Sequence, residues 1–131
     1  MNAAAQQDLG KLILRLSLGV LVLLHGVAKL MGGVGGIVGM AEGAGLPGVV
    51  GYGVLIGEVL GPLMVILGFH ARIGAALIAI NMLFAIGLAH MGELAQLTGT
   101  GGWALELQGM FLFAAIALVF LGPGRWSLNQ R

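Results

Sequence analysis

The chain has 131 residues, of which 59% are hydrophobic and 8% are charged, and its mean hydropathy is +1.05. A soluble domain carries about a quarter charged residues, so this composition excludes a water-soluble globule and predicts one integral membrane domain over residues 1–131. The net charge of +1 gives no sign of a nucleic-acid partner, and the absence of cysteine excludes disulfides and cysteine-ligated metals.

Four windows of the sequence are long and apolar enough to cross a bilayer, which takes about 20 residues. In chain order, they cover residues 12–31, 49–68, 73–91 and 104–121. The polar leader before the first window is not typical of a cleaved signal peptide, so we expect a retained helix. The glycine-rich stretch 32–48 is either a flexible surface loop or a segment that dips back into the bilayer or lies in the interface as a short helix. We therefore predict an all-α membrane protein built as a bundle of four transmembrane helices.

Basic residues set the orientation of the predicted bundle. They cluster before the first window, between the second and third, and after the fourth: Lys11, Arg15, Arg72, Arg125 and Arg131. Because basic residues concentrate on the cytoplasmic side, both termini should be cytoplasmic. Loop 32–48 should then face the periplasm of a bacterial inner membrane, which the chain crosses several times.

The second window carries a row of glycines at every fourth position, Gly53, Gly57 and Gly61, followed by Pro62. Small residues at this spacing allow helix backbones to approach closely in lipid, so the row predicts helix packing within the bundle or in a homo-oligomer. Proline removes a helical N–H donor, so we expect a kink at Pro62.

The strongly polar side chains of the four windows fall in one layer near the periplasmic end. Counted at 1.5 Å per residue from the cytoplasmic basic residues, His25 and Glu58 lie about 21 Å along their helices. The same count puts the other members about 25 to 28 Å along: Lys29, His90, Glu106 and Gln108. Asn81 falls deeper toward the cytoplasm. A mid-membrane carboxylate needs a proton or a partner, and Lys29 or His25 could partner Glu58.

Several short motifs resemble the DoxX family and occur in the family's order. They are HGVAKL at 25–30, Gly57-Glu58, ILGFHARIGA at 66–75, His90-Met91-Gly92, GWALE at 102–106 and LGPGRWSL at 121–128. The resemblance implies a small bacterial inner-membrane protein with four helices. Some DoxX relatives are subunits of a thiosulfate:quinone oxidoreductase, and others are linked to membrane oxidoreductase complexes in redox and sulfur stress.

The resemblance and the polar layer together favour a membrane subunit of a quinone-linked redox system with an outward-facing polar pocket. Quinone carbonyls accept hydrogen bonds, and the layer supplies donors beside apolar walls. The sequence has no haem, flavin or iron–sulfur motif, so electrons must come from a redox partner subunit or a bound reductant, and a bound quinone is the candidate cofactor. The histidines and carboxylates lack the i,i+4 pairing typical of a helical metal site, so no metal is predicted. Two alternatives are a non-catalytic assembly or scaffold subunit and a small-solute or proton transporter.

Overall fold

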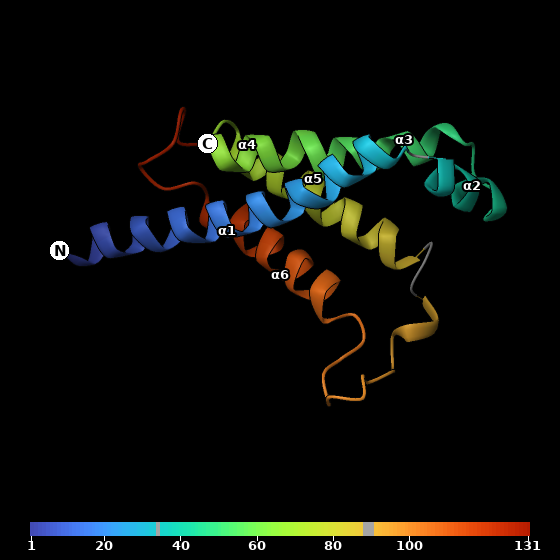
Figure 1. The fold of residues 1–131 in the computed structure, drawn as a ribbon. Coiled ribbons are helices and arrows are strands. Elements are labelled where there is room, and N and C mark those ends of the chain that lie inside the picture. Colours follow the sequence, from blue (N-terminus) through green and yellow to red (C-terminus); the bar gives the residue numbers. More distant parts are fainter. Residues whose placement is uncertain (34, 88–90) are drawn as a thin grey trace.

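The computed structural model describes residues 1–33, 35–87 and 91–131, and these residues form helices joined by turns (Figure 1). The predicted all-helical fold class is therefore confirmed. Residues 97 and 103 form one isolated antiparallel bridge in the link before the last helix. The elements in chain order are α1 (Ala3–Gly32), α2 (Gly35–Gly43), α3 (Val49–Leu55), η1 (Ile56–Leu60), α4 (Gly61–Leu67), α5 (Ala71–Ala85), η3 (Met91–Glu93) and α6 (Glu106–Leu121).

Helix α1 begins well before the predicted first span, because the polar leader is itself helical. The side chain of Asn2 accepts a hydrogen bond of 2.8 Å from the backbone N–H of Ala5, which caps the first turn. The alanines and glutamines that follow favour helix. Helix α1 ends at Gly33, whose φ of 84° few other residues adopt without strain. The glycine-rich stretch 32–48, for which a short helix was one of the expected forms, contains the short helix α2.

Within the described part of the chain, α1 is the one helix long and apolar enough to cross a membrane by itself. Three shorter apolar helices follow, at Gly51–Leu67, Ala71–Ala85 and Glu106–Leu121. The first and third of these lie within the second and fourth predicted windows, whereas Ala71–Ala85 begins two residues before the third window, 73–91.

The helix over the second window changes its winding just before Pro62. In an α-helix, a proline ring clashes with the carbonyl group four residues earlier, which here belongs to Glu58. The π-helical turn η1 spans this position, and the N–H of Gly61 bonds to the carbonyl of Ile56, five residues back. Such π-turns are rare and frequently occur at functional sites. The expected effect of Pro62 thus takes the form of a wider turn that contains Glu58.

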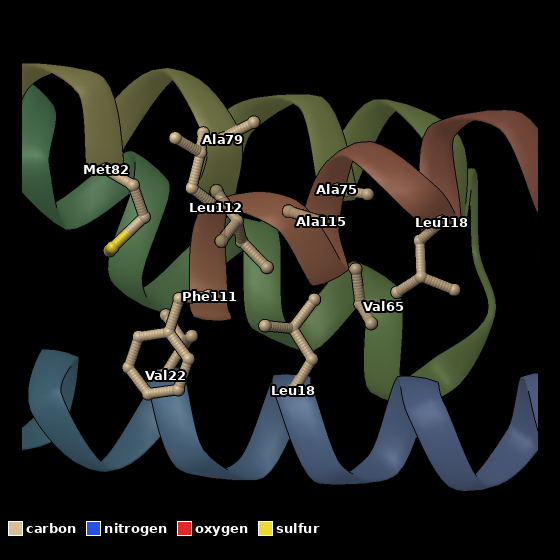
Figure 2. Close-up of a cluster of buried hydrophobic side chains, with 11 residues drawn as sticks. Leu18, Val22, Val65, Ala75, Ala79, Met82, Phe111, Leu112, Ala115 and Leu118 are labelled. Carbon is tan, nitrogen blue, oxygen red and sulfur yellow. The ribbon is translucent and has the colours of Figure 1, made fainter. Parts of the chain in front are cut away.

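A single apolar core joins α1, α4, α5 and α6, and Figure 2 shows their side chains meeting there. The buried members are Leu18, Val22, Val65, Ala75, Ile78, Ala79, Met82, Phe111, Leu112, Ala115 and Leu118. Large apolar side chains also cover the outside of the same helices, as at Ile13, Phe113 and Phe120, which are 57%, 61% and 78% exposed. Apolar exposure on this scale is typical of a protein whose surroundings are themselves apolar.

Two of the three glycines in the predicted packing row face α5. A β-carbon added at Gly57 would overlap the side chain of Asn81, and one added at Gly61 would lie 3.0 Å from the carbonyl oxygen of Gly74. By contrast, a β-carbon at Gly53 would meet nothing within 4 Å. The close approach of the second-window helix to α5 therefore depends on Gly57 and Gly61.

Candidate functional site

The polar centre of the bundle is the carboxylate of Glu58 on η1. Lys29 on α1 donates a hydrogen bond to its Oε2, and Asn81 on α5 donates one of 3.2 Å from Nδ2 to its Oε1. The Glu58 side chain is only 6% exposed, whereas that of Lys29 is 29% exposed. A buried carboxylate without partners would be strongly destabilising. Here, a cation and an amide from two different helices satisfy both of its oxygens.

A cavity of about 210 Å³ lies beside this ion pair, where α1, η1, α5 and α6 meet. Its polar lining comes from three elements: His25 and Lys29 on α1, Glu58 on η1 and Gln108 on α6. The rest of its lining is apolar and consists of Val22, Met82, Ala85, Leu107 and Phe111. The cavity is therefore amphipathic, with polar and apolar groups lining it in nearly equal shares.

The two remaining polar groups of the lining still have hydrogen-bonding capacity. The imidazole of His25 packs edge-on against the ring of Phe111, with centroids 5.8 Å apart and an interplanar angle of 78°. Within the described residues, the side chains of His25 and Gln108 make no hydrogen bond. Both side chains can therefore bond to a molecule in the cavity.

The structure brings four of the six predicted pocket residues together: His25, Lys29, Glu58 and Gln108. The exposed side chain of Glu106 does not line the cavity, and its carboxylate lies near Gly102 instead. Residues two apart on a helix are rotated by about 200° about the helix axis, so their side chains point to nearly opposite sides. Glu106 and Gln108 therefore do not face the same cavity. His90 lies outside the described residues.

Sequence reasoning missed Asn81 as a member of this site because the residue count placed it deeper than Glu58. The count for Glu58 ran from Arg72 and included the turn between α4 and α5, which adds no length to the helix. Glu58 lies nine residues before the end of α4, and Asn81 lies ten residues after the start of α5, so the two are at similar depth. Gly57 was the signal that could have found it. A glycine directly before a membrane carboxylate indicates that another element approaches closely there, and that element carries Asn81.

Within the described residues, no group of three or more histidine or acidic side chains gathers in a way that could hold a metal ion. His70, in the turn between α4 and α5, bonds through its backbone N–H to Oδ1 of Asn129, at 3.0 Å, and does not line the cavity. The site is thus an ion pair beside a small amphipathic cavity.

Comparison with known protein families gives a match over the first two thirds of the chain. Residues 10–91 match the model of the family described as DoxX, which covers more than half of the chain. No curated protein matches the chain, and no solved structure does. The matched stretch contains His25, Lys29, Glu58 and Asn81, so it includes the whole ion-pair cluster.

Proposed function

The chain belongs to the DoxX family and is a membrane protein, and from the cavity at its centre we propose that it is a membrane subunit of a quinone-linked redox system. The observation that carries the proposal is the partly buried Lys29–Glu58 pair beside a cavity whose other polar groups, His25 and Gln108, have no hydrogen-bond partner within the described residues. Such a site suits a flat, uncharged ligand with carbonyl oxygens.

We propose that α1, the α3–η1–α4 stretch, α5 and α6 cross a bacterial inner membrane as a four-helix bundle. Large exposed apolar side chains on these helices support contact with lipid. Lys11, Arg15, Arg72 and Arg125 lie toward one end, which the distribution of positive charge makes cytoplasmic. Both termini are then cytoplasmic, and the cavity lies toward the periplasmic leaflet.

The charge of the cavity supports a neutral ligand. The ammonium group of Lys29 and the carboxylate of Glu58 cancel each other, and Gln108 adds no charge. An anionic ligand would have to compete with Glu58 for Lys29, and a cationic one would have to displace Lys29. A quinone carbonyl oxygen needs only a donor, and Lys29 retains N–H groups beyond the one that it gives to Glu58.

The size of the cavity supports a ring and excludes a whole quinone with its tail. Its volume of about 210 Å³ lies below the roughly 300 to 1,000 Å³ typical of sites for drug-sized ligands. The ring would lie between the apolar side chains of Met82, Leu107 and Phe111. The tail would extend out of the cavity and stay among the lipid chains. Binding of the ring would then not require the tail to leave the bilayer.

A bound quinone supplies redox chemistry by accepting two electrons and two protons, with the electrons coming from a redox partner subunit. In this proposal Lys29 and Gln108 orient the ring by donating hydrogen bonds to its carbonyl oxygens. The imidazole of His25 also lines the cavity and can donate or accept a hydrogen bond beside a carbonyl oxygen. Glu58 fixes Lys29 and balances its charge.

The test is to measure the quinone that purifies with the protein. The chain is expressed in quinone-containing membranes, purified in mild detergent and extracted, and quinone per protein is quantified by mass spectrometry. We expect the wild type to retain quinone, and Gln108→Leu and Glu58→Gln to retain several-fold less. Glu106→Gln is the matched control, because it makes the same chemical change at an exposed carboxylate outside the cavity, and it should retain the wild-type amount. Equal retention by the wild type and Gln108→Leu would contradict the proposal.

One observation favours a second candidate, a non-catalytic assembly subunit. Both oxygens of Glu58 are already bonded, to Lys29 and Asn81, so the cluster can fix the register of three helical elements without any ligand. In that case the wild type would retain no quinone, and Glu58→Gln would weaken association with a partner subunit in a pull-down from membranes.

A further inference from the structure

Glu58 is held between two backbone contacts that leave no room for a side chain. On the α1 side, a β-carbon added at Gly26 would overlap the carbonyl group of Glu58 and would lie 2.9 Å from Cγ2 of Val59. On the α5 side, a β-carbon added at Gly57 would overlap the side chain of Asn81. The π-turn that carries Glu58 therefore touches α1 through one glycine and α5 through another.

The contact at Gly26 also fixes the position of Lys29 relative to Glu58. The two residues are three apart on α1, so they lie one above the other on the same face of the helix. When Gly26 lies against the backbone of Glu58, the ammonium group of Lys29 meets the carboxylate of the same residue. One residue of η1 thus makes both the backbone contact and the ion pair with α1.

Asn81 restricts the same carboxylate from the opposite side. Its Nδ2 bonds to Oε1 and leaves Oε2 for Lys29, and Asn81 itself is only 5% exposed. A carboxylate held at one oxygen cannot rotate freely about its last bond. The ammonium group therefore stays at one place on the edge of the cavity, where its remaining N–H groups are available to a ligand.

We propose that Gly26 and Asn81 are positioning residues that hold Glu58, and through it Lys29, in the geometry the cavity needs. The proposal rests on the proposed function, because it concerns the same cavity, but the position of Lys29 can be measured without any quinone. A side chain at Gly26 would separate α1 from η1. A side chain at position 81 without an amide would release Oε1 of Glu58.

Selective labelling of lysine measures the position of Lys29. The chain contains two lysines, Lys11 and Lys29, and both lie on α1, so Lys11 is an internal reference. The purified full chain in mild detergent is treated with the water-soluble acetyl ester of sulfo-N-hydroxysuccinimide, and peptide mass spectrometry gives the ratio of the two labelling rates. An amine held in a hydrogen bond must leave its partner before it can react, so Lys29 paired with Glu58 should react about tenfold or more slowly than without its partner, as expected for a hydrogen bond between charged groups.

Glu58→Gln calibrates the experiment, because it should release Lys29 from its partner. The ratio of the Lys29 labelling rate to the Lys11 labelling rate in this variant is then the value expected for an unpaired Lys29. We expect Gly26→Ala and Asn81→Leu each to raise the ratio by at least about threefold. Gly10→Ala is the matched control on the same helix, since a β-carbon there meets nothing within 4 Å, and it should leave the ratio unchanged. Circular dichroism and gel filtration establish that each variant is folded. If Gly26→Ala does not fold, Asn81→Leu decides, because it replaces an amide by an apolar group of similar size.

The outcomes separate this proposal from the proposed function. If Glu58→Gln raises the ratio and neither Gly26→Ala nor Asn81→Leu does, the ion pair exists without the two residues and the positioning proposal is wrong. A wild type with slow Lys29 labelling but no retained quinone would contradict the proposed function alone. Quinone retention that falls in Asn81→Leu together with a raised ratio would support both.

Discussion

Helix α1 carries two cationic side chains that bond inside the bundle, Arg15 and Lys29, and they are satisfied in different ways. Arg15 is 1% exposed, and its guanidinium group donates hydrogen bonds to four backbone carbonyls, those of Val65, Ile66, Pro123 and Trp126, at 2.7 to 2.9 Å. Lys29 bonds to one carboxylate beside a cavity. Every bond of Arg15 goes to a fixed backbone atom, whereas Lys29 keeps donors that can bond to a ligand. Under the proposed function, the donors left over on Lys29 are what distinguishes it from the structural cation Arg15.

The Arg15 cluster also explains the path of the C-terminal segment after α6. In Figure 1 this segment returns to the end of α4, where the backbone N–H of Leu128 bonds to the carbonyl of Leu67, at 3.2 Å. The N–H of Arg72 bonds to the carbonyl of Arg131 at 3.2 Å. Arg15 lies between α4 and this segment and bonds to both. It therefore replaces the hydrogen bonds that the turn and the segment would otherwise need from water.

Removing the guanidinium group should have the largest effect on stability. Arg15→Leu leaves four carbonyls without their donor, and each buried orphan costs about 1 to 3 kcal/mol. Because water can reach some of them, we expect a loss of about 3 to 5 kcal/mol in the free energy of unfolding, measured in mild detergent. Arg15→Lys keeps the charge but not the planar fork of donors, so it should recover less than half of the loss. Wild-type stability in Arg15→Lys would show that the charge alone matters there.

Breaking the Lys29–Glu58 pair should destabilise the protein less than Arg15→Leu does, but it should reduce quinone retention more. Glu58→Ala leaves Lys29 without its partner, but a lysine can extend toward the interface, so we expect a loss of about 1 to 3 kcal/mol. The double variant Lys29→Met/Glu58→Gln removes both charges and should regain most of the stability, while quinone retention stays lost. A double variant that binds as the wild type does would make the pair structural, like Arg15, and would remove the contrast between the two regions.

The sequence predicted the Lys29–Glu58 partnership as one of two options, because a membrane carboxylate needs a partner and few cations were available. It could not predict the Arg15 cluster, since the partners of Arg15 are main-chain carbonyls from 50 to 111 residues away. Every residue has a main-chain carbonyl, so the residue types do not show which ones bond to Arg15. Arg15 served only to orient the bundle. The choice between Glu106 and Gln108 also needed the rotation of α6 about its axis, which residue counts do not give.

Two glycines of the row on the second-window helix, Gly53 and Gly57, should respond differently to the same substitution. Gly57→Ala forces a β-carbon into Asn81, and overpacking of this kind typically costs about 1 to 3 kcal/mol. Gly53→Ala adds the same atoms in open space and removes a flexible residue from a helix, so we expect no loss. Thermal unfolding of both variants in the same detergent checks the difference. Equal losses would mean that Gly53 packs against a second copy of the chain, and a change in oligomeric size would then accompany Gly53→Ala.

The smallest effect belongs to a second charged contact at the Arg15 end. Arg125 lies 3.7 Å from the carboxylate of Asp8 and also 4.6 Å above the ring of Trp126, with over half of its side chain exposed. An exposed ion pair contributes about 0.2 to 1 kcal/mol, so Asp8→Asn should lower the free energy of unfolding by less than 1 kcal/mol, and added salt should reduce the difference. Arg125→Gln should cost slightly more, because it also removes the contact with Trp126. An effect of Asp8→Asn as large as that of Arg15→Leu would show that the surface pair, and not the buried fork, holds the C-terminal segment.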